Sequence, residues 1–464
     1  MGASRMKRTA TMMIGLMFVV GCGKTEPTKE QAKLQTEPDI ESSVPEAKIE
    51  EDLPVESFSE RLVAKTKHAN ELEAEFRFAE AAETWREIDA LVTEKFGSES
   101  WQAANARLAG IVASVESNFD EAQLEKLKQI QQHQKQFLNS FKARDFEGAK
   151  KITDASTALT TELFGKQSPM YGKQMLQSAS LNQKTGNSEE AISHYHAAIE
   201  NLKSTFHARH PDIESAHQQL GSLYLEKQKF VPAISNLKAS ARLSAELWGE
   251  DSLQYAKGAN QLGVAYHQAG QLEIAEKVFQ ASEVIRRRKL GPEHSLVAHS
   301  NLNLGIVCLD QKKFDLAAKH LARAVEGFDK EDKSEENMLQ LARKKLATLH
   351  MAKGEPELAA PLLGDVVEFT YARLGSDHPQ VAELQYRQGI ALAKQGKYDE
   401  AEPIFAKALE TQKTKLGESH ASTINTMRAM ALLLKQTRRT SESQNMMREI
   451  QRVSKASDSN EFQR

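Results

Sequence analysis

Apolar and small residues recur along the chain at a spacing of 42 residues. A bulky residue followed by a turn residue forms one column, with turn residues at 165, 207, 249, 291, 375 and 417, and with Lys at 333. A small residue forms a second column, at Gly221, Gly263, Gly305, Ala347, Gly389 and Ala431. No stretch sustains the strict alternation of a strand. The pattern therefore predicts repeated helices.

Each repeat predicts two helices. In the clearest copy the first helix runs from about Gln380 to Lys394, and the second runs from about Asp399 to Lys415. Gly396 stands where a glycine commonly ends a helix. One such pair leaves an apolar face uncovered, so neighbouring pairs must stack. The predicted fold class is all-α, a right-handed superhelical solenoid of roughly eight or nine antiparallel helix pairs.

The 42-residue spacing breaks down at both edges of the array. Gly97 and Gly165 are 68 residues apart, so an extra helix-sized piece interrupts this region, and a long polar helix is expected from Phe119 to about Phe141. Near the C-terminus, Ser443 replaces the usual Ala, which indicates a polar cap. We therefore expect degenerate repeats over 58–164, regular repeats over 165–440, and a polar cap and tail over 441–464.

At these columns the chain resembles tetratricopeptide repeats, in the 42-residue variety found in kinesin light chains. The best copy reads Leu-Gly-Ser-Asp-His-Pro-Gln-Val-Ala over 374–382 and Gly-Lys-Tyr-Asp-Glu-Ala-Glu over 396–402. HEAT-type arrays have similar periods but lack this second turn. The resemblance implies a non-catalytic scaffold that binds a protein or peptide. It also implies that the first helix of each pair lines a concave groove.

In that family the residues three and two positions before the small residue commonly contact the ligand. The candidate groove residues implied here are Gln218, Asn260, Asn303, Lys344, Lys345, Tyr386, Arg387 and Arg428. Kinesin light chains carry Asn-Asn at these positions, whereas this chain keeps one Asn in only two copies, so their ligands do not transfer. The amides come early and the cations late, which favours a partner with an acidic segment. The alternative is a solvated face without a ligand.

The N-terminus predicts targeting to a membrane. Residues 1–22 have a basic start and an uncharged apolar stretch, as in a signal peptide. The end of this segment resembles the lipobox of bacterial lipoproteins, in which the thiol at the position of Cys22 carries the lipid. An ordinary signal peptide with an incidental Cys is the alternative. We expect a lipid anchor in the bacterial cell envelope, with the outer membrane favoured because Gly23, rather than Asp, follows the Cys.

Residues 23–57 read as an acidic, disordered tether. The stretch 23–60 holds 11 Asp and Glu against 4 Lys, together with four prolines. The whole chain is 40 % hydrophobic, 6 % aromatic and 27 % charged, with a net charge of −3. That balance argues against a highly basic nucleic-acid binder. Its two cysteines, Cys22 and Cys308, supply no disulfide framework.

No motif indicates catalysis, a cofactor, a metal or a small-molecule substrate. His210, His294, His378 and His420 share one column, but stacking separates them and each directly precedes a predicted helix. Cys308 falls at an inward helix position, which favours inert packing over a reactive thiol. Besides a scaffold, we consider a chaperone-like assembly factor that holds envelope proteins transiently, and an enzyme or its regulatory subunit. A further hypothesis places the acidic tether in the basic part of the groove.

Overall fold

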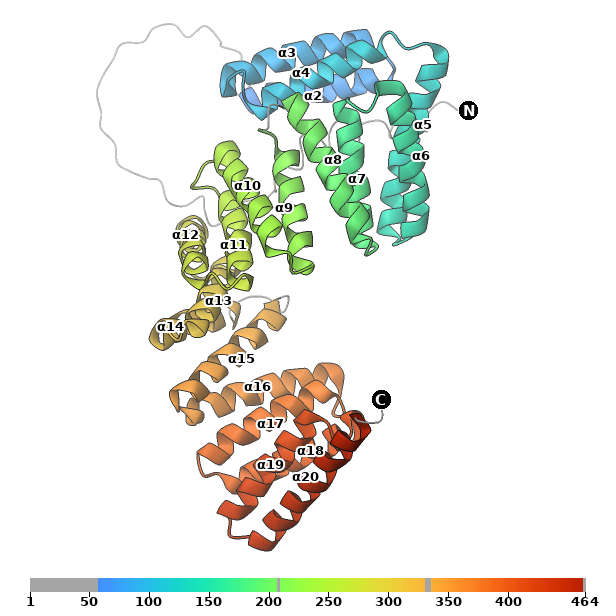
Figure 1. The fold of residues 1–464 in the computed structure, drawn as a ribbon. Helices are drawn as coiled ribbons and strands as arrows, with labels where there is room; N and C mark the ends of the chain where they lie inside the picture. Colours follow the sequence, from blue (N-terminus) through green and yellow to red (C-terminus); the bar gives the residue numbers. More distant parts are fainter. Residues whose placement is uncertain (1–56, 207–208, 330–334, 462–464) are drawn as a thin grey trace, which may run out of the picture. The chain divides into compact units, whose positions relative to one another are not determined.

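Helices occupy the chain in the order that the repeat pattern predicts. A computed structural model describes residues 57–206, 209–329 and 335–461; the expected signal peptide with Cys22, residues 23–56 of the tether, and positions 207 and 333 lie outside these ranges. Within them the chain forms 19 α-helices and no β-strand. This confirms the all-α class. The helices divide into two compact units, the first ending at Gly249 and the second beginning at Glu250 (Figure 1).

The first unit contains nine helices and the second contains ten. The first unit comprises α2 (Phe58–Ala74), α3 (Phe78–Phe96), α4 (Trp101–Glu116), α5 (Glu121–Lys142), α6 (Phe146–Phe164), α7 (Pro169–Lys184), α8 (Ser188–Phe206), α9 (Pro211–Glu226) and α10 (Phe230–Trp248). The second comprises α11 (Leu253–Gln268), α12 (Leu272–Leu290), α13 (Ser295–Asp310), α14 (Phe314–Asp329), α15 (Glu336–Lys353), α16 (Pro356–Leu374), α17 (Pro379–Lys394), α18 (Tyr398–Leu416), α19 (Ala421–Gln436) and α20 (Thr440–Glu461). Among the described residues, no helix has both the length and the apolar content needed to cross a bilayer.

The small-residue column lets the two helices of a pair approach closely. In α17 and α18, Gly389 faces the fully buried ring of Phe405, and a Cβ on Gly389 would lie 2.6 Å from the ring carbon Cε1. The same contact occurs 84 residues earlier, where a Cβ on Gly305 would lie 2.6 Å from Cγ of Leu321. Both separations are shorter than a normal carbon–carbon contact. The column is therefore set by packing within each pair.

Helix boundaries follow the expected turn chemistry. The structure starts α17 at Pro379 and α18 at Tyr398, one residue before each predicted start. Gly396 has a φ of +77°, the left-handed conformation that an L side chain rarely adopts. His378 caps α17, because its Nδ1 accepts a hydrogen bond of 3.2 Å from the N–H of Gln380. These local features end one helix and let the next one run antiparallel to it.

A partly buried His–Asn pair joins the two helices of a pair in each unit. In the first unit, Nδ1 of His217 in α9 donates to Oδ1 of Asn236 in α10 at 2.8 Å. In the second, Nδ1 of His320 in α14 donates to Oδ1 of Asn301 in α13 at 2.9 Å. Each Asn Nδ2 donates to the carbonyl four residues earlier in its own helix. Burial lowers the pKa of both histidines, so the neutral rings are favoured.

The insertion near the N-terminus redirects the chain. The long polar helix expected to end near Phe141 is α5, which packs against α6. Helix α4 turns instead onto helices much later in the sequence. Its Leu108 joins the apolar cluster of α8 and α9, and the ring of Trp101 lies 5.6 Å from that of Trp248 at the end of α10. Asn105 Oδ1 accepts a 3.0 Å hydrogen bond from Nε2 of His210, 105 residues away. The first unit is therefore closed by a contact between its early and late helices.

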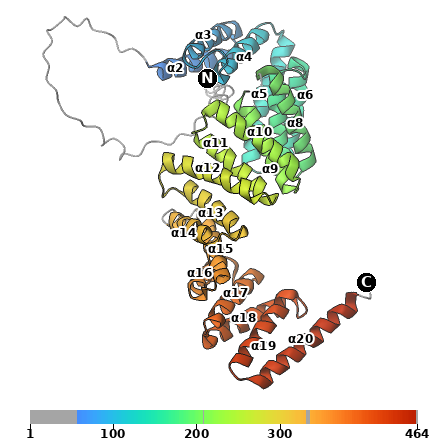
Figure 2. The same ribbon diagram turned by 60° about the vertical axis from the view of Figure 1, so that its left-hand side comes forward.

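The C-terminal helix of the second unit has an open outer face. Met447 in α20 occupies the column of the fully buried Phe405, yet 45 % of its surface is exposed, since α20 is the last helix that the structure describes (Figure 2). Ser443, which replaces the usual Ala, donates a 2.7 Å hydrogen bond to the carbonyl of Ala431.

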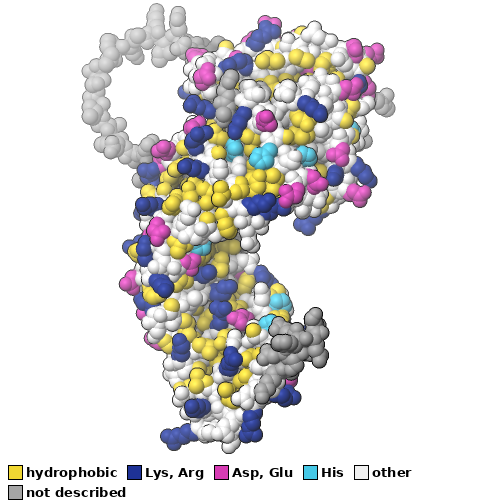
Figure 3. Space-filling view, viewed as in Figure 1, with side chains coloured by type: hydrophobic (Ala, Val, Ile, Leu, Met, Phe, Trp, Pro, Cys, Tyr) yellow, Lys and Arg dark blue, Asp and Glu magenta, His cyan; other side chains and the backbone are white. Residues whose placement is uncertain are grey.

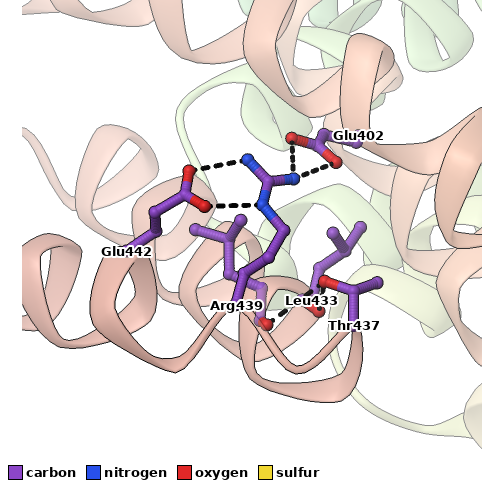
Figure 4. A network of polar contacts seen from close by, with 6 residues as sticks. Glu402, Leu433, Thr437, Arg439 and Glu442 are labelled. Atoms are coloured by element: carbon purple, nitrogen blue, oxygen red, sulfur yellow. Dashed lines mark hydrogen bonds and ion pairs between the residues drawn. The ribbon is translucent and has the colours of Figure 1, made fainter.

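Ion pairs connect the turns of adjacent pairs. Nη1 of Arg439, at the turn before α20, donates to both carboxylate oxygens of Glu402 in α18 at 2.7 Å, and its Nε and Nη2 bond Glu442 (Figure 4). The corresponding residue of an earlier repeat, Lys313, pairs with Glu276 at 2.7 Å. These pairs face solvent, where one pair contributes at most about 1 kcal/mol.

Candidate functional site

Most first helices of successive pairs contact one another in the second unit. Helix α11 contacts α13, α13 contacts α15, and α17 contacts α19. Seven of the eight candidate groove residues lie on these five helices. The eighth, Gln218 in α9 of the first unit, is only 6 % exposed and offers a partner little surface. The candidate face is therefore formed by α11, α13, α15, α17 and α19 (Figure 2).

The early part of this face is occupied by internal hydrogen bonds. Asn303 Nδ2 in α13 donates to Oδ1 of Asn260 in α11 at 3.0 Å, so the structure brings these two candidates together. Two turns further along both helices, His267 Nε2 lies 2.7 Å from Oδ2 of Asp310. Asn260, Asn303, His267 and Asp310, at this end of the face, therefore already have partners.

The later part of the face gathers positive charge. Lys344 in α15 lies close enough to Arg387 in α17, and to its neighbour Lys345, for their charges to act on it. Burial lowers the pKa of Lys344, and the positive charges of Arg387 and Lys345 lower it further. We call these three residues the basic patch. Lys and Arg side chains are visible over α15 to α17 (Figure 3). Arg428 lies in the same column on α19 and is exposed.

Cations held close together favour a negatively charged ligand, because its binding relieves their mutual repulsion. Tyr386 adds an apolar element beside the patch. Its side chain is partly buried, its ring lies 6.2 Å from that of Phe405, and burial raises the pKa of its hydroxyl group. The arrangement suits a peptide that presents carboxylates and a neighbouring apolar side chain.

Sequence reasoning missed one charged residue of this face, Glu383. It lies four residues before Arg387 on α17, and its Oε1 accepts a 2.9 Å hydrogen bond from Nε of Arg387. Its negative charge also opposes the lowering of the Lys344 pKa. The spacing of Glu383 and Arg387 could have indicated this pair, because residues four apart lie on the same face of a helix. The family columns drew attention only to the positions two and three before the small residue.

The four histidines of the shared column act as helix caps. His210, His294, His378 and His420 each accept at Nδ1 a hydrogen bond of 3.1–3.2 Å from the N–H two residues later. His210 differs from the others because it is buried at 2 % exposure and stacks on Phe206 with ring centres 4.0 Å apart. Burial lowers its pKa to about 4.

Other reactive groups are isolated or buried. Cys308 is 1 % exposed within the apolar cluster of α13 to α15, and burial raises the pKa of its thiol to about 11, which confirms an inward packing position. In the described ranges, no group of three or more His, Cys, Asp or Glu is placed to hold a metal ion.

In the first unit, the carboxyl groups of Glu73 and Glu116 lie close enough for the charge of Glu73 to act on Glu116. Glu73 in α2 accepts a 2.8 Å hydrogen bond from Nε1 of Trp85 in α3, and burial raises its pKa to about 7. Glu116 at the end of α4 is 8 % exposed, and burial together with the charge of Glu73 raises its pKa to about 8. This pair makes the α2–α4 helices sensitive to pH.

Comparisons with known proteins agree with the repeat pattern. A tetratricopeptide repeat family model matches residues 254–330, 337–414 and 380–456. No curated protein matches the chain. A solved structure of kinesin-light-chain TPR-like repeats from Podosopora anserina is 21 % identical, with 44 % of this chain and 98 % of that chain covered and a TM-score of 0.40.

Two further solved structures are similar to this chain at the same level. BtubC (BKLC) from P. vanneervenii is 19 % identical, with 52 % of this chain and 92 % of that chain covered and a TM-score of 0.42. Aspartyl phosphate phosphatase F from Bacillus subtilis is 13 % identical, with 86 % and 94 % covered and a TM-score of 0.43. Taken with the helix pairs and their spacing, the family match establishes that the second unit contains tetratricopeptide repeats.

Proposed function

We propose that this protein is a membrane-anchored, non-catalytic scaffold that binds an acidic segment of a protein partner on the face formed by α11, α13, α15, α17 and α19. Tetratricopeptide repeats bind peptides and proteins, and the finer assignment rests on the basic patch. The carrying observation is the placement of Lys344 and Lys345 on α15 and of Arg387 on α17, the first helices of consecutive pairs, with the charges of Lys345 and Arg387 acting on Lys344.

An acidic segment fits this face for electrostatic reasons. Carboxylates accept charge-assisted hydrogen bonds from Lys and Arg that are roughly twice as strong as neutral ones. Arg428, exposed on α19, extends the positive charge along the same column. Rigid helices hold these groups before binding, so little conformational entropy is lost on their side of the interface.

We further propose that a lipid on Cys22 anchors the chain to a membrane of the bacterial cell envelope, with the outer membrane favoured. The support is the sequence alone: a basic start, an apolar stretch, and a Cys at the expected cleavage point. Changing Cys22 to Ser is expected to release the protein from the membrane fraction and to abolish labelling by a radioactive fatty acid. Retention of the label in that variant contradicts the anchor.

Cross-linking in native membranes, followed by mass spectrometry of the captured proteins, tests the binding function. The test variant replaces Lys344, Lys345, Arg387 and Arg428 by Glu. A matched control replaces four exposed cations of the second helices and their ends, Lys277, Lys319, Arg323 and Lys415, by Glu. Both variants therefore change the net charge equally.

A single partner lost from the test variant and kept by the control supports the scaffold. A partner kept by both variants refutes the basic patch as its binding site. Many clients kept by both variants favour the chaperone-like alternative instead.

A further inference from the structure

An acidic side chain, Glu383, lies next to Arg387 of the basic patch. Arg387 donates only its Nε to Glu383, at 2.9 Å, and its two terminal nitrogens have no hydrogen-bond partner among the residues that the structure describes. The charge of Glu383 also acts on Lys344, on the neighbouring helix α15. Both members of the Glu383–Arg387 pair are half exposed, at 40 % and 48 % of their side chains. A ligand that reaches the patch therefore meets Glu383 as well.

We propose that Glu383 is a built-in counter-ion of the basic patch, and that it selects partners with several closely spaced carboxylates over partners with a single one. This inference rests on the proposed binding of an acidic segment. It adds the chemistry that the segment must have and names the residue that limits its affinity.

The selection follows from the charges present. Lys344, Lys345 and Arg387 supply three positive charges, and Glu383 offsets one of them. A single carboxylate of a ligand, bound at the terminal nitrogens of Arg387, is attracted by Arg387. It is also repelled by Glu383, which then lies about 6 Å away, the length of two hydrogen bonds. A run of carboxylates also reaches Lys344 and Lys345, where attraction exceeds the one repulsion. Selectivity of this kind comes from a repulsive group built into the site.

Glu383 has an opposite possible role, which the experiment must separate. A salt bridge between residues four apart on a helix also holds the Arg side chain in one position. If Glu383 served to orient Arg387, its removal would weaken binding. If it acts as a competing anion, its removal strengthens binding. The sign of the change therefore distinguishes the two roles.

The test uses the full-length chain and fluorescently labelled peptides, with binding followed by fluorescence anisotropy. The probes are octaglutamate, a Gly-Ser octamer with one Glu, and octaglutamine as the uncharged reference. Glu383→Gln removes the charge and keeps the shape, and Glu383→Ala is the second variant. Glu410→Gln, at an exposed position of α18, is the control that changes net charge equally.

For Glu383→Gln we expect octaglutamate to bind roughly 3- to 10-fold more tightly than to the wild type. Two charges about 6 Å apart imply this range at an exposed site with a dielectric constant between about 40 and that of water. The single-Glu peptide should gain a larger factor, because it lacks compensating contacts. Glu410→Gln should leave both affinities within about twofold, since distant exposed charges are screened.

Unchanged or weaker binding to Glu383→Gln and Glu383→Ala overturns the counter-ion proposal. Equal affinity of the wild type for octaglutamate and the single-Glu peptide overturns the selection. The proposed function fails differently: octaglutamate then binds no better than octaglutamine, and reversing Lys344, Lys345 and Arg387 to Glu changes nothing.

Discussion

Replacing Glu116 by Gln should make the α2–α4 helices more stable at neutral and alkaline pH. Glutamine has the shape of a protonated glutamate but cannot ionise. In the wild type, burial and the charge of Glu73 raise the pKa of Glu116 from 4.5 to about 8. Because the folded-state pKa lies above the unfolded-state value, stability is greatest below pH 4.5 and falls as the pH rises through about 8.

The size of the effect follows from the two pKa values. Each pH unit between them corresponds to about 1.4 kcal/mol. Full ionisation of Glu116 therefore costs up to about 5 kcal/mol, and the cost at pH 7 is about 3 kcal/mol. Partial opening that admits water reduces both figures. We expect a difference of at least about 1.4 kcal/mol at pH 8.5, which is a tenfold change in an equilibrium constant.

Amide hydrogen exchange measured by mass spectrometry reports local opening of these helices. Protection factors for α4 in Glu116→Gln should exceed those of the wild type at least tenfold at pH 8.5, and the two should nearly coincide at pH 4.5. The control is Glu94→Gln, at an exposed position of α3, which should match the wild type throughout. Equal protection of wild type and Glu116→Gln at pH 8.5 would refute the argument that Glu116 ionises within the folded helices.

Three further tests address packing and turns. Gly389→Ala should destabilise the second unit by about 1–3 kcal/mol in urea denaturation. The control is Gly110→Ala, whose Cβ would lie 3.4 Å from its nearest neighbour, and which should stabilise α4 by up to about 1 kcal/mol. Unchanged stability of Gly389→Ala would contradict the tight contact. His210→Ala removes a helix cap, a ring stack and the hydrogen bond to Asn105, and should lower the free energy of unfolding by about 3 kcal/mol or more. His294→Ala removes the cap and should lower it by about 1 kcal/mol. Equal losses in urea denaturation would mean that the contact with α4 adds no stability. Arg439→Ala should lower the melting temperature by no more than about 3 °C, with a smaller difference in 1 M salt; a larger drop would show that this exposed pair is a major support.

Much of the fold was predictable because its determinants are local and repeated. Gly396 and the small residue at 389 each mark a backbone requirement that recurs every 42 or 84 residues. The bounds of α17 and α18 follow from such residues to within a residue or so. The capping position of His378 and the inward position of Cys308 were also readable from their columns, and the structure confirms both.

Contacts between distant parts of the sequence were not predictable. Asn105 and His210 meet because α4 turns back across the first unit, and no column relates them. Glu73 and Glu116 look like ordinary surface charges until three helices enclose them. Within the candidate face, the columns indicated Lys344, but the opposing Glu383 lay outside them. A repeat pattern predicts the contacts that recur in every copy. It does not predict contacts in regions where the sequence deviates from the repeat.

The two His–Asn bonds bear on how such arrays can be recombined. His217 and Asn236 occupy positions 84 residues before Asn301 and His320, with the residue types exchanged between the two helices. A chimera that joined α9 to α14 would bury two imidazoles against each other, and one that joined α13 to α10 would bury two amides. Transplanting α9 with α10, or α13 with α14, keeps donor and acceptor together. The hairpin of two helices is thus the unit that keeps each His with its Asn, and a recombination point between hairpins preserves both bonds.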